Sequence, residues 1–256
     1  MQKNIIKFLG TAGARFVVMR QLRRSGGIWF HLNDTDILVD PGPGSLMRCL
    51  LSRPPLNPRE LDGIVLTHRH LDHANDVNII IESMTNGGFD QKGVVLAPKD
   101  ALDSDPVILK YLRGYVEQIN ELHLGTTYTI GSVSLSAAVA HQHGVETYGL
   151  NIKTDRHLIS YISDTKYYSG LEKHYLGDVL ILNVVLLRGS SKIQHLSLPD
   201  AERIIAANRP KVAVLTHFGM TMLRAKPWEL AEKLSGKLGV SVIAASDGTE
   251  LDIDDI

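Results

Sequence analysis

Four short apolar runs in this chain end in histidine or aspartate, and this recurrence constrains the fold more than any other feature of the sequence. The first run leads into His-Arg-His-Leu-Asp-His at positions 68–73, and the later runs end at positions 141–143, 164 and 217. Short runs of Ile, Val and Leu bounded by turn-forming residues are typical of buried strands. The sequence therefore predicts sheets whose strand ends bring these polar side chains together.

The order of the predicted elements indicates the fold class. We expect strands over residues 5–10, 27–32, 35–40, 63–67, 94–97, 127–140, 149–154, 157–163, 179–187, 212–216 and 241–245. We expect helices over residues 44–52, 74–85, 106–120, 167–176, 198–208 and 227–238. Strands and helices do not alternate strictly, so a sandwich of mixed sheets with helices outside is favoured over a doubly wound parallel sheet. The sequence contains no repeat and no Pro/Gly/Ser-rich linker, so residues 1–256 are expected to form a single domain.

The segment 106–120 gives the clearest helical pattern. Asp105 can cap its start, and Pro106 suits the first turn. Apolar side chains then recur on one face of the expected helix, at Ile108, Leu112, Tyr115 and Ile119.

The charge balance and the apolar content narrow the class of protein. There are 27 Lys and Arg against 28 Asp and Glu, a net charge of -1, so no general excess of positive charge is available to attract nucleic acid or an anionic membrane. The apolar content of 44% supplies enough aliphatic side chains for a sizeable core. We expect a small-molecule substrate, with long nucleic acid disfavoured as a partner, and a homo-oligomer stays open.

Apolar run lengths and cysteine usage bear on the location of the protein. The run at 5–10 is interrupted by Lys7 and is too short for the core of a signal peptide, and no segment approaches the roughly 20 apolar residues that cross a bilayer. The single cysteine, Cys49, cannot form an internal disulfide, which fits a reducing compartment. We expect a cytoplasmic protein that is not embedded in a membrane.

The residues at positions 68–73 predict a metal site. Alternate residues of an extended chain share a face, so His68 and His70 can point the same way. Asp72 and His73 follow where we expect the next helix to begin. Without a cation, three imidazoles and a carboxylate packed this closely would serve no packing purpose. We therefore expect two adjacent metals, completed by ligands from the other strand ends at His141 or His143, Asp164 and His217.

These residues resemble the metallo-β-lactamase superfamily, whose HxHxDH motif is matched by His68 to His73. The resemblance spans nearly the whole chain and implies an α/β fold of four layers, an αββα sandwich with mixed sheets. Asp40, in Leu-Val-Asp-Pro-Gly-Pro-Gly, is similar to the family's early aspartate, which supports the ligand loop from outside the coordination sphere. The resemblance also implies that one metal is bound by His68, His70 and His143, that the other is bound by Asp72, His73 and His217, and that Asp164 bridges them.

Two further stretches are similar to the ribonuclease Z-like and phosphodiesterase branch of that superfamily. The opening Phe8-Leu-Gly-Thr-Ala-Gly13 resembles the first strand of that branch, and Gly149 follows His143 at a spacing that the branch shows. This spacing favours His143 over His141 as the third ligand, since either could follow the strand. The sequence has no long basic or Gly/Pro-rich arm for gripping transfer RNA, which again favours a small substrate.

Asp72 and His195 are the candidates for direct roles in catalysis. His195 lies just before the helix expected at 198–208, which Ser197 would cap. An imidazole beside the free amides of a helix start is a natural site for an anion, so His195 is expected to contact the substrate and not the metals. A histidine packed in a loop is the alternative interpretation.

The predicted chemistry is hydrolysis by a metal-bound hydroxide held between two metals roughly 3.5–4 Å apart. Zinc is the first choice, and Mn or Fe also accept His and carboxylate ligands. The resemblance to the phosphodiesterase branch favours a phosphodiester, such as a small or cyclic nucleotide. A thioester or lactone hydrolase, a mononuclear iron dioxygenase and a non-catalytic metal-binding module are the alternatives.

Overall fold

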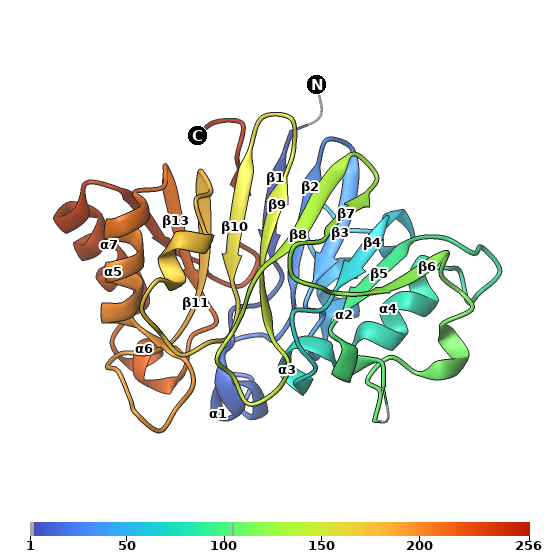
Figure 1. Ribbon diagram of the computed structural model, residues 1–256, viewed down its shortest axis with the longest axis horizontal. Coiled ribbons are helices and arrows are strands. Elements are labelled where there is room, and N and C mark those ends of the chain that lie inside the picture. Colours follow the sequence, from blue (N-terminus) through green and yellow to red (C-terminus); the bar gives the residue numbers. More distant parts are fainter. Residues whose placement is uncertain (1–2, 104) are drawn as a thin grey trace.

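The computed structural model, which describes residues 3–103 and 105–256, places the strands in two sheets that share an apolar interior (Figure 1). The first sheet has the strand order β15-β1-β2-β3-β4-β5-β6. Its strands are β1 (Ile5–Phe8), β2 (Ile28–Leu32), β3 (Thr35–Val39), β4 (Gly63–Val65), β5 (Val94–Ala97), β6 (Gln118–Glu121) and β15 (Glu250–Asp252).

The second sheet has the order β14-β13-β11-β10-β9-β8-β7, and the short strand β12 pairs with β11. Its strands are β7 (Thr127–Ile130), β8 (Val133–Ala140), β9 (Tyr148–Lys153), β10 (Leu158–Ile162), β11 (Val179–Leu186), β12 (Leu196–Ser197), β13 (Val212–Thr216) and β14 (Ser241–Ala244).

Helices cover the outer faces of both sheets (Figure 1). Those beside the first sheet are α2 (Ser45–Leu50) and α4 (Val77–Met84), and those beside the second are α5 (Leu198–Asn208), α6 (Met220–Arg224) and α7 (Pro227–Leu238). The short helices α1 (Ala14–Met19) and α3 (Leu71–Ala74) lie at the lower edge in Figure 1. Short 3-10 helices span Pro58–Glu60, Lys99–Ala101, Lys110–Leu112 and Leu171–His174. No helix in the described part of the chain is long and apolar enough to cross a membrane.

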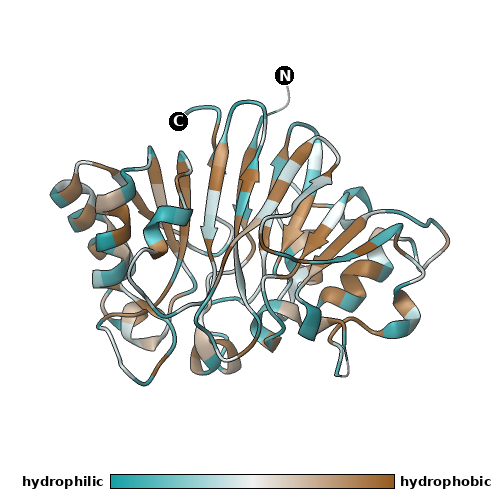
Figure 2. Ribbon diagram, viewed as in Figure 1, coloured by the Kyte–Doolittle hydropathy of each residue, from teal (hydrophilic) through white to brown (hydrophobic). Residues whose placement is uncertain are grey.

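Three apolar clusters fill the spaces between these layers, as the brown segments of Figure 2 indicate. In β3, Ile37 and Val39 belong to the cluster between the sheets, whereas Leu38 belongs to the cluster beneath α4. In β11, Ile181 faces the other sheet and Leu182 faces the helices. Strands buried on both faces need apolar residues at every position, which explains the continuous runs in the sequence. The predicted αββα sandwich with mixed sheets is confirmed.

The strand directions decide where the site can form. Strands β3, β4, β5 and β6 run parallel in the first sheet, as do β10, β11, β13 and β14 in the second. Strand β8 is antiparallel to β9, which is antiparallel to β10, so β8 and β10 point the same way. The carboxyl ends of β4, β8, β10 and β13 are followed by the candidate ligands, and β10 points to the lower edge in Figure 1.

The helix predicted over 106–120 is wrong. The chain there forms only the 3-10 helix Lys110–Leu112 and then enters β6, which pairs in parallel with β5. Ile108 and Leu112 are fully buried in the outer cluster, as their spacing predicted, but the backbone that carries them is mostly irregular. The spacing of these apolar residues therefore indicates burial and not a helix. The residues that follow form a strand because they pair with β5.

Other boundaries also differ from the predictions. The strand predicted over 127–140 is a hairpin of β7 and β8, which turns at Gly131 with a φ of 54°. The helix predicted over 167–176 is reduced to the 3-10 helix Leu171–His174, and that over 74–85 shortens to α4 after the separate α3. The helices predicted at 198–208 and 227–238 are confirmed as α5 and α7.

Candidate metal centre

The candidate ligands converge at the strand-end edge around the carboxylate of Asp164, which is 2% exposed. Its Oδ2 atom lies 3.5 Å from His73 Nε2, 3.8 Å from His143 Nε2 and 3.9 Å from His68 Nε2. Its Oδ1 atom lies 3.4 Å from His217 Nε2. Side chains that follow β4, β8 and β13 thus surround the buried carboxylate that follows β10.

The remaining candidate ligands complete two groups of three beside Asp164. In each group the ligand atoms lie within 4.8 Å of one another, and the groups are His68, His70 and His143 on one side and Asp72, His73 and His217 on the other. In the first group, His143 Nε2 lies 3.0 Å from His70 Nδ1. In the second, Asp72 Oδ2 lies 3.7 Å from His217 Nε2. These are the two sets that the sequence resemblance implies, and the structure also brings Asp40 together with His68 and His73, and His195 together with His143 and Asp164.

Buried ring nitrogens test whether this centre fits metal ions. Among the described residues, His68 Nε2, His73 Nε2 and His217 Nε2 are buried and have no hydrogen-bond partner. A buried polar atom without a partner costs roughly 1–3 kcal/mol, and a cation at the centre would satisfy all three nitrogens. Imidazole and carboxylate ligands without a thiolate suit Zn, Mn or Fe. The donor set therefore fits the divalent metals expected from the sequence.

The outward-facing nitrogens of these imidazoles are held by acceptors. Asp40 Oδ2 accepts a hydrogen bond from His73 Nδ1 at 3.0 Å, and the same carboxylate accepts from the amide and the hydroxyl of Thr67 at 2.7 Å each. The carbonyl of Gln194 accepts from His143 Nδ1 at 3.1 Å. These bonds leave the Nε2 lone pairs of His73 and His143 free to face the centre. Asp40 thus supports the ligand loop, as the sequence resemblance implies.

Two glycines allow the ligand loops to approach other backbone segments. A Cβ atom at Gly13 would overlap the carbonyl of His217, and one at Gly42 would overlap the carbonyl of Asp72. His217 itself has a φ of 59°, a left-handed conformation that is uncommon for residues other than glycine. Two backbone hydrogen bonds to the neighbouring segment hold this conformation: the Gly13 amide donates to the carbonyl of Phe218 at 3.0 Å, and the Phe218 amide donates to the carbonyl of Thr11 at 2.8 Å.

Burial and neighbouring charges shift the pKa values of the side chains at the centre in different directions. Burial would raise the pKa of Asp164, but the imidazoles of His217, His195 and His73 outweigh it and hold that pKa well below its usual range. Burial lowers the pKa of His73, yet Asp40 and Asp164 outweigh burial and raise it well above 6.5. Burial also holds the pKa of His68 well below 6.5. An ionised carboxylate therefore stands among imidazoles that include a neutral ring.

His141 lies outside both groups of candidate ligands. Its Nδ1 atom donates to the backbone carbonyl of Asp164 at 3.2 Å, so its Nε2 atom accepts from the buried hydroxyl of Tyr175 at 2.5 Å. Burial lowers the pKa of His141 to about 3. The structure thus places His143 among the candidate ligands and gives His141 other partners.

His195 lies closer to the candidate ligands than the sequence predicted. Its Nδ1 atom is 3.6 Å from Asp164 Oδ2, is buried, and has no hydrogen-bond partner among the described residues. The rings of His195 and His143 are 5.1 Å apart. Ser197 is the N-cap of α5 as predicted, and its own amide donates to Asp200 at 3.0 Å, so this one amide is not free to bind an anion.

The sequence did not predict the polar side chains that lie near Asp164 in the interior. Asn183 Nδ2 donates to Asp164 Oδ1 at 3.0 Å, and the Tyr161 hydroxyl lies 3.4 Å from Asn183 Oδ1. Ser163 Oγ lies 2.7 Å from Thr67 Oγ1 and so links the two sheets. A lone asparagine within the aliphatic run of β11 was the signal for this arrangement.

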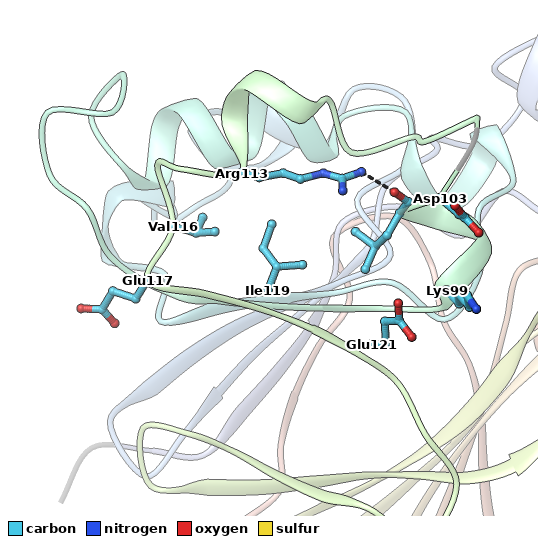
Figure 3. A pocket seen from close by; sticks show the side chains of 8 residues that line it. Lys99, Asp103, Arg113, Val116, Glu117, Ile119 and Glu121 are labelled. Atoms are coloured by element: carbon cyan, nitrogen blue, oxygen red, sulfur yellow. Dashed lines mark hydrogen bonds between the residues drawn. The ribbon is translucent and has the colours of Figure 1, made fainter.

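A second hollow lies away from the candidate ligands, beside β6 (Figure 3). It has a volume of about 400 Å³ and none of the candidate ligands lines it. Arg113 spans it, and its guanidinium donates to the carbonyls of Leu102 at 2.6 Å and Ile108 at 3.1 Å. Its cation is therefore engaged with the backbone, and the other charged residues that line the hollow are Lys99, Asp103, Glu117 and Glu121.

A model of the β-lactamase superfamily domain matches residues 35–218. One relative, the uncharacterized protein MJ1374 of Methanocaldococcus jannaschii, is 28% identical over 255 residues, which are 97% of this chain and 94% of the relative. The family match contains every candidate ligand.

Solved structures with the same fold cover nearly the whole chain. The metallo-β-lactamase fold protein YhfI from Bacillus subtilis has a TM-score of 0.80 at 17% identity, covering 98% of this chain and 99% of that one. A diphosphatase from the PhnP family has a TM-score of 0.73 at 18% identity, covering 98% and 97%. Human tRNase Z, short form, has a TM-score of 0.71 at 16% identity, covering 97% and 99%. At these identities the likeness establishes the fold.

Proposed function

This chain belongs to the β-lactamase superfamily, and we propose that it is a dinuclear metal-dependent phosphodiesterase of the ribonuclease Z-like branch, acting on a small or cyclic nucleotide. The observation that carries the proposal is the pair of ligand groups on either side of Asp164. Three buried Nε2 atoms without partners among the described residues support a cation in each group. Zinc suits this donor set, and Mn or Fe are the alternatives.

The side chains at the mouth of the centre have separate tasks in this reaction. When bound, two such metals activate a water molecule and stabilise negative charge on the phosphoryl oxygens. Asp72 is 20% exposed, so besides binding a metal it can accept a hydrogen bond from the attacking water. His195 is 16% exposed and lies near Asp164, where it can donate a proton to the departing oxygen.

Several observations support phosphorus over acyl chemistry. His143 and Gly149 keep the spacing that resembles the phosphodiesterase branch. Two of the structural neighbours are described as a diphosphatase and as a tRNase. The near-neutral net charge supports a small substrate over a long nucleic acid.

The proposal also includes the organisation and location of the protein. We propose that residues 1–256 act as one domain. Cys49 is a free, buried cysteine, which supports a reducing cytoplasm as the location.

A substrate panel tests the proposal directly. Protein reconstituted with Zn should cleave bis-p-nitrophenyl phosphate and a cyclic nucleotide faster than a lactone or a thioester. The Asp164→Ala variant is the matched control and should lose this activity while remaining folded. Preference for an acyl substrate would replace phosphodiesterase with an acyl hydrolase, and oxygen consumption with one Fe per chain would indicate a dioxygenase. Metal binding without turnover of any substrate would indicate a binding module.

A further inference from the structure

Asn183 is a polar residue in the middle of a buried strand. It lies in β11, whose other residues are aliphatic, and it is 2% exposed. Its neighbours Leu182 and Val184 belong to the cluster beneath the helices, so alternation along the strand directs Asn183 to the space between the sheets. A buried amide is costly unless both its ends are bonded, so its partners decide its role.

The two ends of the Asn183 amide face different polar groups. Its Nδ2 atom donates to Asp164 Oδ1 at 3.0 Å, and the Tyr161 hydroxyl lies 3.4 Å from its Oδ1 atom. An ionised carboxylate can only accept, so the amide nitrogen must face Asp164 and the amide oxygen must face Tyr161. The Tyr161 hydroxyl also lies 3.3 Å from Asp40 Oδ2. Asn183 therefore stands between the carboxylate at the centre and the carboxylate that holds His73.

The amide bond distinguishes the two oxygens of Asp164. Oδ1 receives the hydrogen from Asn183 and lies 3.4 Å from His217 Nε2, while Oδ2 lies among the ring nitrogens of His73, His143 and His195 at 3.5, 3.8 and 3.6 Å. Rotation of the carboxylate plane away from this orientation would break the amide bond and turn the other oxygen away from these nitrogens, so the amide bond opposes that rotation. We propose that Asn183 is a positioning residue that keeps Asp164 Oδ2 turned toward the imidazoles and so raises the affinity of the centre for its metals. This inference rests on the proposed role of Asp164 as a metal ligand.

Other side chains at position 183 would not hold the Asp164 carboxylate in this orientation. A leucine of similar size would leave Asp164 Oδ1 buried without its amide donor. An aspartate would place a second carboxylate against Asp164 and offer no donor in its ionised form. The neutral amide adds a hydrogen bond to the carboxylate without neutralising it, so Asp164 keeps its charge for a cation.

Metal affinity is the property that tests this inference. In the full chain, Asn183→Leu should weaken Zn binding about 10- to 100-fold, the usual effect of losing an outer hydrogen bond to a ligand. The matched control is Asn151→Leu in β9, because Asn151 donates to the carbonyl of His174 and accepts from Ser160 but touches no candidate ligand. The control should keep the Zn affinity of the parent. Affinity is measured by competition with a chromophoric chelator, which requires no substrate.

A spectroscopic measurement separates positioning from a general loss of packing. The visible spectrum of the Co(II)-loaded protein reports ligand geometry, so it should change in Asn183→Leu and stay unchanged in Asn151→Leu. Asn183→Asp, which keeps the side-chain shape, serves as a second variant if the leucine protein does not fold, and it should also lose affinity. Parent-like Zn affinity in a folded Asn183 variant, or an equal loss in the Asn151 control, overturns the inference. Failure of the phosphodiester panel alone leaves this result intact, whereas a parent that binds no Zn overturns both proposals.

Discussion

His143 Nε2 and His70 Nδ1 lie 3.0 Å apart, so the two imidazoles that follow β8 and β4 meet nitrogen to nitrogen at the centre. His143 already donates through Nδ1 to the carbonyl of Gln194, so its Nε2 presents a lone pair to His70. Without a cation His70 Nδ1 can donate to this lone pair, and with a cation at the group of His68, His70 and His143 both nitrogens could bind it. His141, two residues earlier, is bonded to Tyr175 and the Asp164 backbone instead.

The contrast between these histidines gives the first prediction. His143→Ala should lose metal from the group that contains His68 and His70, whereas His141→Ala should keep the metal content of the parent. Elemental analysis after gel filtration measures both. Loss of metal from His141→Ala with retention in His143→Ala would reverse the assignment.

Metal stoichiometry gives the second prediction. Because two groups of three ligands flank Asp164, reconstituted protein should bind close to two divalent ions per chain. Asp72→Ala should keep one of them, since Asp72 belongs to the second group only. Removal of the metals with a chelator should lower Tm, because a ligand that binds only the folded state stabilises it. One ion or fewer per chain, after reconstitution with excess Zn, contradicts the dinuclear centre.

The packing of Gly149 gives the third prediction. A Cβ atom at this position would overlap the Tyr175 hydroxyl and crowd His141 Nε2. Gly149→Ala should therefore lower the free energy of unfolding by about 1–3 kcal/mol, the usual cost of overpacking a core. Denaturant unfolding measures the change. Adding Tyr175→Phe removes the overlapping oxygen and should recover part of the loss, and a double variant no more stable than Gly149→Ala would show that the overlap is not the cause.

The sequence was informative wherever one local pattern had one structural outcome. Polar residues at the ends of apolar runs predicted which side chains meet at one edge, because parallel strands bring their carboxyl ends to one edge, and the family resemblance implied their division into two groups. The start of α5 at Ser197 and Leu198 followed from local capping chemistry. The helix over 106–120 failed because its apolar spacing fits a buried irregular segment as well as a helix, and the partner strand β5 is more than ten residues away in sequence.

Contacts between residues that are far apart in sequence could not be predicted, because they depend on how the strands pair. Nothing near Asn183 in the sequence indicates that its amide meets Asp164, since that contact depends on the pairing of β10 with β11. His195 was assigned to the mouth of the site from its position before α5, but its 3.6 Å approach to Asp164 required the fold. The candidate ligands could be predicted from the sequence, whereas the hydrogen bonds that orient them could not.

The last prediction concerns His195, whose Nδ1 atom faces Asp164 without a hydrogen-bond partner among the described residues. If His195 donates a proton to the departing oxygen, His195→Ala should keep its metal content and lose about 10²- to 10⁴-fold in kcat. The loss should be smaller for a p-nitrophenolate leaving group, which departs without protonation, than for an alkoxide. Parallel kinetics on the two phosphodiesters, with metal content measured on the same preparation, make this comparison.

Each other outcome of the His195→Ala experiment would indicate a different role for this histidine. Because His195 belongs to a group with His143 and Asp164, loss of a metal from His195→Ala would show that it is a ligand and not a proton donor. Equal losses of kcat for both leaving groups, with metal retained, would indicate stabilisation of phosphoryl charge. An unchanged kcat for both substrates would contradict any catalytic role and leave His195 as a histidine packed in a loop.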